Sequence, residues 1–353
     1  MNMLPSHPKL PVHLLSACFN YTVASYKFYW FLSLLDAVEA GESRISKRRL
    51  FAGMVANGWY TYHYFHLNFG RQDKLGVAID FIKDREGIDV DEKRGIIIQH
   101  LLTEITKETH QVLMHFDHEV PHRFLSPWFP GMGDNWKQIY LASQKFERNV
   151  LYALFSDEIE INPDWFEYLF ENIGILRGFC YWKLSLYLQK LNPNVPDIAG
   201  KLIRPPFRNA LTRQRKLFWD VVFSEVGQID CIYTGRPLTL EDYAVEHFLP
   251  YAFVCHDQIW NLIPADKRFN MTKSDRLPPF DRYFDRYFNL QHLAITTVTR
   301  VQPKNKFLLE YLYLIPDYRI GQVCDVELLR QRFRDAAHPM ITIAANNGFE
   351  FMV

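Results

Sequence analysis

The sequence predicts an α+β fold that is mostly helical and built from two domains, one over residues 1–200 and one over residues 201–353. Apolar residues recur at helical spacing through most of the chain, whereas short β-favouring runs occur at few places. The Asn-Pro-Asn-Val-Pro stretch at residues 192–196 is the clearest linker, because asparagine and proline favour turns. With 353 residues, 48% of them apolar, each domain can bury a core of its own.

The N-terminal domain is expected to consist of helices with one small hairpin. Ser46 is placed to cap the second helix and Pro163 to begin the last one. The β-favouring runs at 150–155 and 159–161 flank a polar turn and predict the hairpin. The aromatic stripe from Tyr26 to Trp30 is either a platform for stacking bases or part of the core, and its helical spacing favours the core. The expected helices cover residues 24–40, 46–65, 73–83, 91–108, 136–146 and 165–191.

Three histidines in this domain form a candidate metal site. His115, His118 and His122 would share one face of a helix if the helix continued through them. Pro121 makes that continuation doubtful, because proline lacks the backbone donor that a helix interior needs. A polar helix end leading into the Pro/Gly-rich loop at 121–136 is therefore favoured over metal binding.

Composition narrows the class of protein. Forty Lys and Arg residues balance forty Asp and Glu residues, so a nucleic-acid-binding surface requires its positive charge to be clustered. Five scattered cysteines indicate reduced thiols rather than a disulfide framework. No run approaches the ~18 apolar residues that span a bilayer, and the first residues lack the features of a signal peptide. We therefore expect a cytoplasmic protein with no membrane partner.

A cluster of positive charge begins the second domain. Between residues 201 and 216 there are six basic side chains and no acidic one. Such a run is often only a solvated face, but here it directly precedes a candidate catalytic motif. We therefore expect it to contact the phosphates of a nucleic acid, which supply affinity without sequence preference. The six residues are Lys201, Arg204, Arg208, Arg213, Arg215 and Lys216.

The stretch over residues 230–278 carries the candidate catalytic residues. Runs at 245–248 and 259–263 predict two short strands, and residues 266–274 predict one or two helical turns that stop before two prolines. This arrangement brings the side chains of the first strand close to one face of the helix. Asn270 and Lys273 share that face, because they are three residues apart.

The residue types in this stretch suit hydrolysis of a phosphodiester. Glu246 and Asn270 offer a pair of hard oxygen ligands, which fit Mg²⁺ and also Mn²⁺. A bound ion would hold the scissile phosphate and stabilise the departing oxygen. His247 is the natural general base, because imidazole titrates near neutral pH.

The full string of residues resembles the HNH nuclease motif, also called the ββα-metal finger. The resemblance covers residues 230–278 of the chain. Its order and spacing match the family pattern at several points, where acidic-His-hydrophobic-x-Pro is followed by a central Asn and then by Asn-x-x-Lys. The matching segments are Cys231-x-Tyr-Thr-Gly, Glu246-His247-Phe-Leu-Pro, Trp260-Asn261-Leu262 and Asn270-x-x-Lys273-Ser.

The resemblance implies a metal-dependent endonuclease that hydrolyses DNA and leaves 5′-phosphate and 3′-hydroxyl ends. It implies that Asn261 bonds the backbone around the loop and helps to orient His247, and that Lys273 and Arg268 offer charge to phosphate oxygens. Nucleases of this kind joined to a large extra domain look like bacterial anti-phage defence or restriction effectors. That role rests on analogy alone.

The sequence departs from many HNH domains in its cysteines. Those domains carry two Cys-x-x-Cys pairs that bind a structural zinc, which needs four nitrogen or sulfur ligands. Here Thr234 stands three residues after Cys231, and Cys255 has no cysteine partner at the matching distance. No structural zinc is therefore expected.

Two alternatives stay open at the level of sequence. In the first, the nuclease cleaves RNA instead of DNA. In the second, the chain is a non-catalytic nucleic-acid-binding or assembly subunit that uses the HNH fold as a scaffold. In the second case the N-terminal domain would bind a protein partner or form an oligomer. Helices expected at 280–290, 306–314 and 326–337 would cap the nuclease module.

Overall fold

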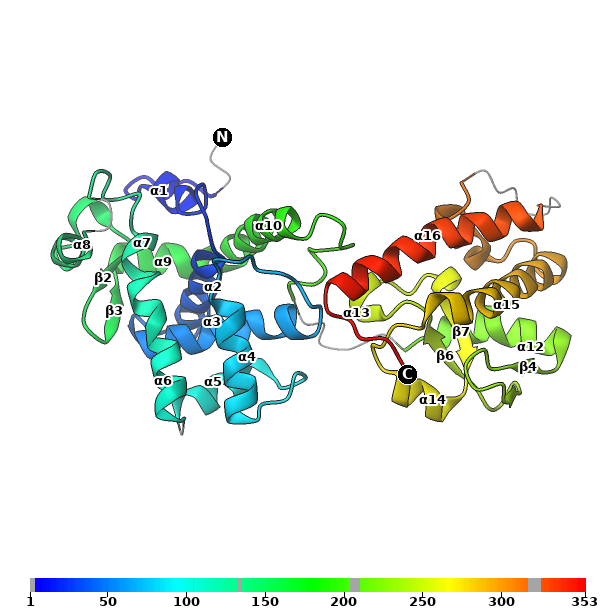
Figure 1. Ribbon diagram of the computed structural model, residues 1–353. Helices are drawn as coiled ribbons and strands as arrows, with labels where there is room; N and C mark the ends of the chain where they lie inside the picture. The colour runs from blue at the N-terminus through cyan, green and yellow to red at the C-terminus, as the bar shows by residue number, and fades with distance from the viewer. Residues whose placement is uncertain (1–3, 104, 133–134, 204–209, 317–324) are drawn as a thin grey trace. The chain divides into compact units, whose positions relative to one another are not determined.

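The computed structural model describes residues 4–103, 105–132, 135–203, 210–316 and 325–353. It confirms the mostly helical α+β class (Figure 1). The chain divides into two compact units. Unit 1 comprises Met1–Pro193 with Ile198–Arg204, and unit 2 comprises Asn194–Asp197 with Pro205–Val353.

Unit 1 is organised around α2 (Tyr26–Glu39), a helix buried on almost every side. The four consecutive aromatic residues at 28–31 are almost completely buried, so the aromatic stripe belongs to the core. The helix packs against α3 (Lys47–His63) and α10 (Ile173–Leu191). Ser46 caps α3, as its sequence position predicts, by accepting a hydrogen bond from the backbone of Arg49.

Two helices that the sequence predicts as continuous are divided in unit 1. The one expected over 91–108 stops at Leu102, and a new helix starts where Thr106 provides a side-chain cap. The one expected over 165–191 breaks at Asn172. The remaining helices of the unit are α1 (Val12–Ala17), α4 (Leu75–Glu86), α5 (Arg94–Leu102), α6 (Lys107–Met114), α7 (Pro121–Phe124), α8 (Trp136–Ser143) and α9 (Pro163–Glu171).

A three-stranded antiparallel sheet lies at one side of unit 1. The predicted hairpin forms from β2 (Tyr152–Leu154) and β3 (Glu158–Ile161). On its other edge β3 pairs with β1 (Arg44–Ser46), with Ile45 opposite Ile159. The sequence did not reveal β1, because three residues are too few to display a strand period.

The three histidines of the candidate metal site in unit 1 do not share a helix face. His115–His118 form a 3₁₀ turn after α6, and a new helix begins at Pro121. The first and second of these histidines are exposed, whereas His122 is buried. Within the described parts of the chain, no group of three or more His, Cys, Asp or Glu residues is arranged to hold a metal ion.

Unit 2 carries the small strands and long helices that surround the motif. Two of its helices after the motif, α15 (Phe280–Val301) and α16 (Val326–Asn346), are longer than predicted, and α16 passes through Pro339. The segment at 306–314 is a 3₁₀ helix, η5 (Lys306–Tyr313). The other helices are α11 (Thr212–Gln214), the π-helical turn η3 (Arg215–Trp219), α12 (Asp220–Val226), α13 (Tyr251–Val254), the 3₁₀ turn η4 (Ile259–Asn261) and α14 (Lys267–Lys273).

The strands of unit 2 form two antiparallel pairs. One pair is β4 (Ile229–Asp230) with β5 (Pro237–Leu238), and the other is β6 (Ala244–His247) with β7 (Leu262–Ala265). β7 starts three residues later than predicted, because residues 259–261 form the turn η4 before the strand begins. The order β6, β7, α14 places two strands and a helix together, as expected of a ββα module.

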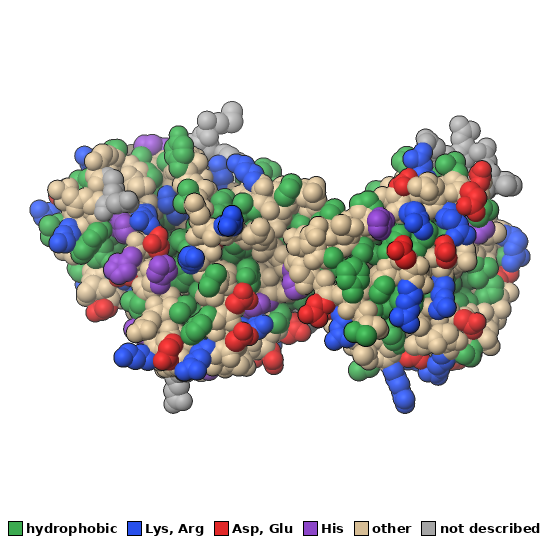
Figure 2. Space-filling model, viewed as in Figure 1, with side chains coloured by type: hydrophobic (Ala, Val, Ile, Leu, Met, Phe, Trp, Pro, Cys, Tyr) green, Lys and Arg blue, Asp and Glu red, His purple; other side chains and the backbone are tan. Residues whose placement is uncertain are grey.

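The surface carries charges of both signs. On the face that Figure 2 shows, Lys and Arg side chains are interspersed with Asp and Glu side chains. Among the residues that the structure describes, no helix has the length and apolar character needed to cross a bilayer.

Candidate active site

Glu246 and Lys273 of the motif meet where β6 faces α14. In the β6–β7 ladder Glu246 lies opposite Ile263, and His247 lies opposite Leu262. Successive side chains of a strand point to opposite faces. Glu246 therefore points toward α14, whereas His247 points toward the loop that joins the two strands, as their separate contacts show.

Glu246 lies at the centre of a buried ion pair. The Nζ atom of Lys273 lies 2.6 Å from Oε1 of Glu246 and also donates to the backbone oxygen of His247, at 3.0 Å. The hydroxyl group of Tyr233 donates to Oε2 of Glu246, at 3.2 Å. Burial raises the pKa of Tyr233 well above its ordinary value, and the Glu246 carboxylate adds to the shift. Both carboxylate oxygens of Glu246 are thus engaged by donors.

Lys273 does not lie where the sequence places it. The expectation is an exposed ammonium group that meets phosphate, but the side chain is 0% exposed and paired with Glu246. The three-residue spacing of Asn270 and Lys273 correctly predicted that both lie on one helix, about one turn apart. It could not predict that an acidic residue on the facing strand would bind the ammonium group.

His247 is held by a carboxylate that the sequence did not identify. Its Nε2 atom lies 2.9 Å from Oδ1 of Asp257, whose side chain is 24% exposed. The ring of Tyr251 packs edge-on against the imidazole, with 5.6 Å between ring centres. His247 itself is only 4% exposed. Asp257 could have been considered as a partner of His247, because it lies in the loop between the two predicted strands. Strand periodicity, however, does not distinguish it from the other residues of that loop.

Asn261 closes the loop between the strands from within. Its Oδ1 atom accepts from the backbone N–H of Leu249, at 2.8 Å, and its Nδ2 atom donates to the backbone oxygen of the same residue, at 2.9 Å. The side chain is completely buried. This is the backbone contact that the resemblance implies for this asparagine, and it fixes the backbone two residues after His247.

Substitution of Asn261 by alanine is expected to destabilise the protein by about 2–4 kcal/mol, because a buried N–H and a buried C=O of Leu249 would both lose their partner. Urea unfolding of wild type and variant measures the difference. Asn305→Ala is a matched control, because that amide also bonds backbone but lies in a partly exposed loop. Equal loss in the two variants would contradict the structural role of Asn261.

Asn270 is the motif residue with the least protein contact. It is half-buried on α14, and its side-chain amide forms no hydrogen bond within the described residues. The amide lies on the helix face that turns Lys273 toward Glu246. Arg268, on the same helix, is exposed and forms no ion pair within the described residues. Both side chains are therefore available to an external ligand.

The start of α14 is fixed by Asp266. Its Oδ1 atom accepts from the backbone N–H groups of Arg268 and Phe269, both at 2.9 Å. Its Oδ2 atom accepts from Arg236, at 2.7 Å, and the same guanidinium group reaches Asp242. The Phe269 N–H and the Arg236 guanidinium hold the pKa of Asp266 below its usual range. These bonds set the direction in which α14 presents Asn270 and Lys273.

The cysteines near the motif take part in packing. Cys231 is buried, and its sulfur accepts from the backbone N–H of Asp266, at 3.4 Å. The turn that follows is closed by a hydrogen bond from the N–H of Gly235 to the oxygen of Cys231, at 2.8 Å. Gly235 has a φ of 71°, which favours glycine at this position. Cys255 ends α13 and is half-buried.

The basic cluster at 201–216 separates into different environments. Lys201 belongs to unit 1 and is buried. Arg215 donates to the backbone oxygens of Tyr243 and Leu240, and its guanidinium group stacks 4.2 Å from the ring of Tyr243. Its donors stabilise unit 2 instead of facing a nucleic acid. Arg213 and Lys216 are exposed, and Arg204 and Arg208 lie outside the described residues.

The sequence of this site matches a known protein family. The family model for HNH endonuclease matches residues 231–279. This segment, called the HNH domain below, is similar to HNH endonucleases. Comparison with curated proteins and with solved structures found no match to the chain.

The HNH domain contains every candidate catalytic residue that the sequence predicts. Glu246, His247, Asn261 and Asn270 all lie within the matched segment, as does Asp257. The match supports a nuclease that acts on nucleic acid. Unit 1 lies outside the match.

Proposed function

We propose that the HNH domain is a metal-dependent endonuclease that hydrolyses phosphodiester bonds of DNA, with His247 as general base. The observation that carries the proposal is the Asp257–His247 hydrogen bond within a matched HNH segment. A carboxylate bonded to one imidazole nitrogen fixes the orientation and tautomer of the ring and stabilises its protonated form. With the proton on Nε2 shared with Asp257, the lone pair that takes a proton from water is on Nδ1.

The residues around Glu246 fit a hard divalent cation. The buried Glu246 carboxylate creates a negative potential that favours a positive charge beside it. In this structure the Lys273 ammonium group occupies that position. The amide of Asn270 adds an oxygen donor on the same side of α14. Glu246 and Asn270 would hold Mg²⁺ or Mn²⁺ after Lys273 releases one carboxylate oxygen. When bound, the ion would supply charge that stabilises the phosphate and its leaving oxygen.

The opposite directions of Glu246 and His247 suit hydrolysis of a phosphodiester. In-line displacement requires the attacking water and the leaving oxygen on opposite sides of phosphorus. A phosphate at the edge of β6, next to residues 246 and 247, would have the base on one side and the carboxylate with the Asn270 amide on the other. Because His247 is nearly buried and contacts the Tyr251 ring, the proposal requires side chains around the imidazole to move before water and phosphate enter.

Supercoiled plasmid tests the proposal directly. Purified protein with Mg²⁺ is expected to nick or linearise the plasmid, and EDTA is expected to stop the reaction, because the carboxylate and amide need a cation between them and the phosphate. Mn²⁺ is expected to restore cleavage. Loss of plasmid that continues at the same rate in excess EDTA would contradict the metal-dependent mechanism, and single-stranded RNA in a parallel assay decides between the two nucleic acids.

One observation favours a second function. The Glu246–Lys273 pair is buried and satisfied without any ion, as in a structural ion pair. A domain that keeps this pair permanently would bind nucleic acid without cutting it. Plasmid that stays intact with Mg²⁺ but is retarded on a gel would support this non-catalytic alternative.

Asp257 is proposed as a positioning residue, which leads to a distinct prediction. Asp257→Asn is expected to lower kcat roughly ten- to a hundredfold with little change in KM, because the ring loses the partner that orients it. Asp257→Glu is expected to recover part of that loss. Steady-state cleavage of a labelled duplex measures both constants. An equal change in kcat for Asn and Glu, or an effect confined to KM, would contradict positioning through His247.

A further inference from the structure

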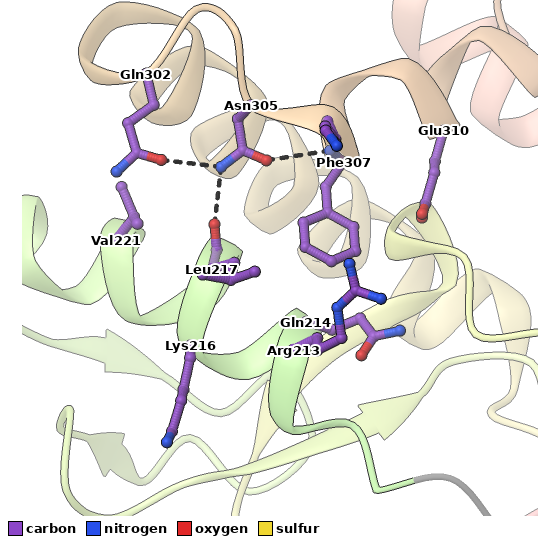
Figure 3. Close-up of a pocket in the computed structure, with 10 residues that line it drawn as sticks. Arg213, Gln214, Lys216, Leu217, Val221, Gln302, Asn305, Phe307 and Glu310 are labelled. Carbon is purple, nitrogen blue, oxygen red and sulfur yellow. Dashed lines mark hydrogen bonds between the residues drawn. The ribbon is translucent and has the colours of Figure 1, made fainter.

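A pocket in unit 2 is formed away from the motif but is connected to it. The pocket has a volume of about 480 Å³ and lies between the helix at 212–226 and the segment at 302–310 (Figure 3). Volumes of about 300–1,000 Å³ are typical of ligand sites. Its lining includes three basic side chains, three amides, one carboxylate and the apolar side chains of Leu217, Val221 and Phe307.

The basic side chains of this pocket have no acidic partner among the residues that the structure describes. Arg213, Lys216 and Lys306 are exposed, and none of the three forms an ion pair within the described residues. In Figure 3 the Arg213 side chain points toward the ring of Phe307. Guanidinium and ammonium groups without acidic partners next to an aromatic ring match the two parts of a nucleotide, its phosphate and its base.

The walls of the pocket are held in place. The Asn305 amide donates to the backbone oxygen of Leu217, at 2.8 Å, and its oxygen accepts from the backbone of Phe307, at 3.1 Å. The Phe307 ring packs edge-on against Phe218, with 6.2 Å between ring centres. A ligand would therefore meet a surface formed in advance, so that little ordering is needed on binding.

Two pocket residues also hold the loop that carries Asp257. The Nε2 atom of Gln214 donates to the backbone oxygen of Asp257, at 3.3 Å, and the Glu310 carboxylate accepts from the backbone N–H of Ile259, at 2.5 Å. Asp257 in turn bonds His247. The pocket is thus one hydrogen-bonded step from the loop that positions the proposed base.

We infer that this pocket is a subsite for the nucleic-acid strand, where Arg213 and Lys306 bind a phosphate next to the one that is cut and Phe307 stacks on its base. The inference rests on the proposed nuclease function and extends it by naming where the strand continues beyond the scissile bond. Glu310 is the one carboxylate in the lining, and its charge opposes the ligand. Its removal should therefore strengthen binding.

Fluorescence anisotropy with a fluorescein-labelled single-stranded DNA oligonucleotide, in EDTA so that nothing is cleaved, tests the inference. Arg213→Ala/Lys306→Ala is expected to weaken binding roughly tenfold or more at moderate salt, and to reduce the slope of log K against log salt by about 1.4, two contacts at ~0.7 each. The matched control is Lys304→Ala/Arg332→Ala, which removes the same charges from exposed side chains that do not line the pocket. Glu310→Gln keeps the acceptor for Ile259 and is expected to tighten binding a few-fold.

The outcomes separate this inference from the nuclease proposal. Equal affinity of the Arg213/Lys306 variant and the control variant would overturn the subsite even if the wild type cleaves DNA. A selective loss of binding would support the subsite even if no protein cleaves with Mg²⁺, in which case the nuclease proposal alone fails. Saturable binding of AMP that depends on Arg213, with oligonucleotide affinity unchanged, would assign the pocket to a free nucleotide and overturn the inference.

Discussion

His247→Ala is expected to reduce DNA cleavage by a factor of roughly 10² to 10⁴, the usual contribution of a general base. The physical reason is that no other imidazole in the HNH domain combines a place on β6 with a carboxylate on its Nε2 atom. Initial rates of plasmid nicking at saturating Mg²⁺ measure the effect. The variant should still bind the oligonucleotide, because His247 contributes no charge to the pocket.

The control for this prediction is His338→Ala. His338 is exposed on α16 and contacts the ring of Phe280 in a tilted arrangement, so the same substitution there leaves the motif unchanged. His247→Asn adds a second check, because it keeps a donor for Asp257 while removing the base. Cleavage by the His247 variants at the rate of the His338 variant would remove His247 from the mechanism.

Lys273→Met is expected to destabilise the protein by about 3–5 kcal/mol, because it leaves the buried Glu246 carboxylate without its cation. The Tyr233 hydroxyl would remain its one charge-neutral donor among the contacts that the structure describes. Urea unfolding in EDTA measures the loss. The Lys273→Met/Glu246→Gln double variant should regain much of the stability, since the unpaired charge is gone.

The same variant reports on the ion. If Glu246 and Asn270 hold a divalent cation, millimolar Mg²⁺ should raise the melting temperature of Lys273→Met more than that of wild type, because the ion replaces the missing ammonium group. Lys273→Met/Asn270→Ala should lose part of this gain. A melting temperature that does not respond to Mg²⁺ or Mn²⁺ would mean that the position next to Glu246 accepts only a side-chain cation.

The sequence allowed the elements of the motif to be predicted, since strand alternation at 245–248 and the two prolines that follow the next helix are local features. It placed the second strand too early, because Ile259 and Trp260 are apolar and β-favouring but form a 3₁₀ turn with Asn261, whose side chain bonds the backbone of Leu249. Tertiary hydrogen bonds overrode local preference there.

The contacts of the site could not be predicted in the same way. Asp257 and Lys273 reach their partners across ten and twenty-seven residues of sequence, respectively. Which acidic residue contacts which basic residue depends on the conformation of the loop between β6 and β7. Hydrophobic periodicity does not predict that conformation. Arg215 shows the same limit, because its neighbours in sequence are basic and solvent-facing, whereas its own donors bond the backbone of residues 240 and 243.

The proposed mechanism requires Glu246, the neighbour of His247 on β6, to share one divalent cation with Asn270. Diffraction from crystals soaked in Mn²⁺ with a non-cleavable oligonucleotide tests it most directly, because manganese gives an anomalous signal. We expect one strong peak within about 2.0–2.6 Å of an oxygen of each side chain, with the Lys273 ammonium group displaced from Oε1 of Glu246. An intact Glu246–Lys273 pair with no peak between β6 and α14, in crystals that contain the oligonucleotide, would contradict it.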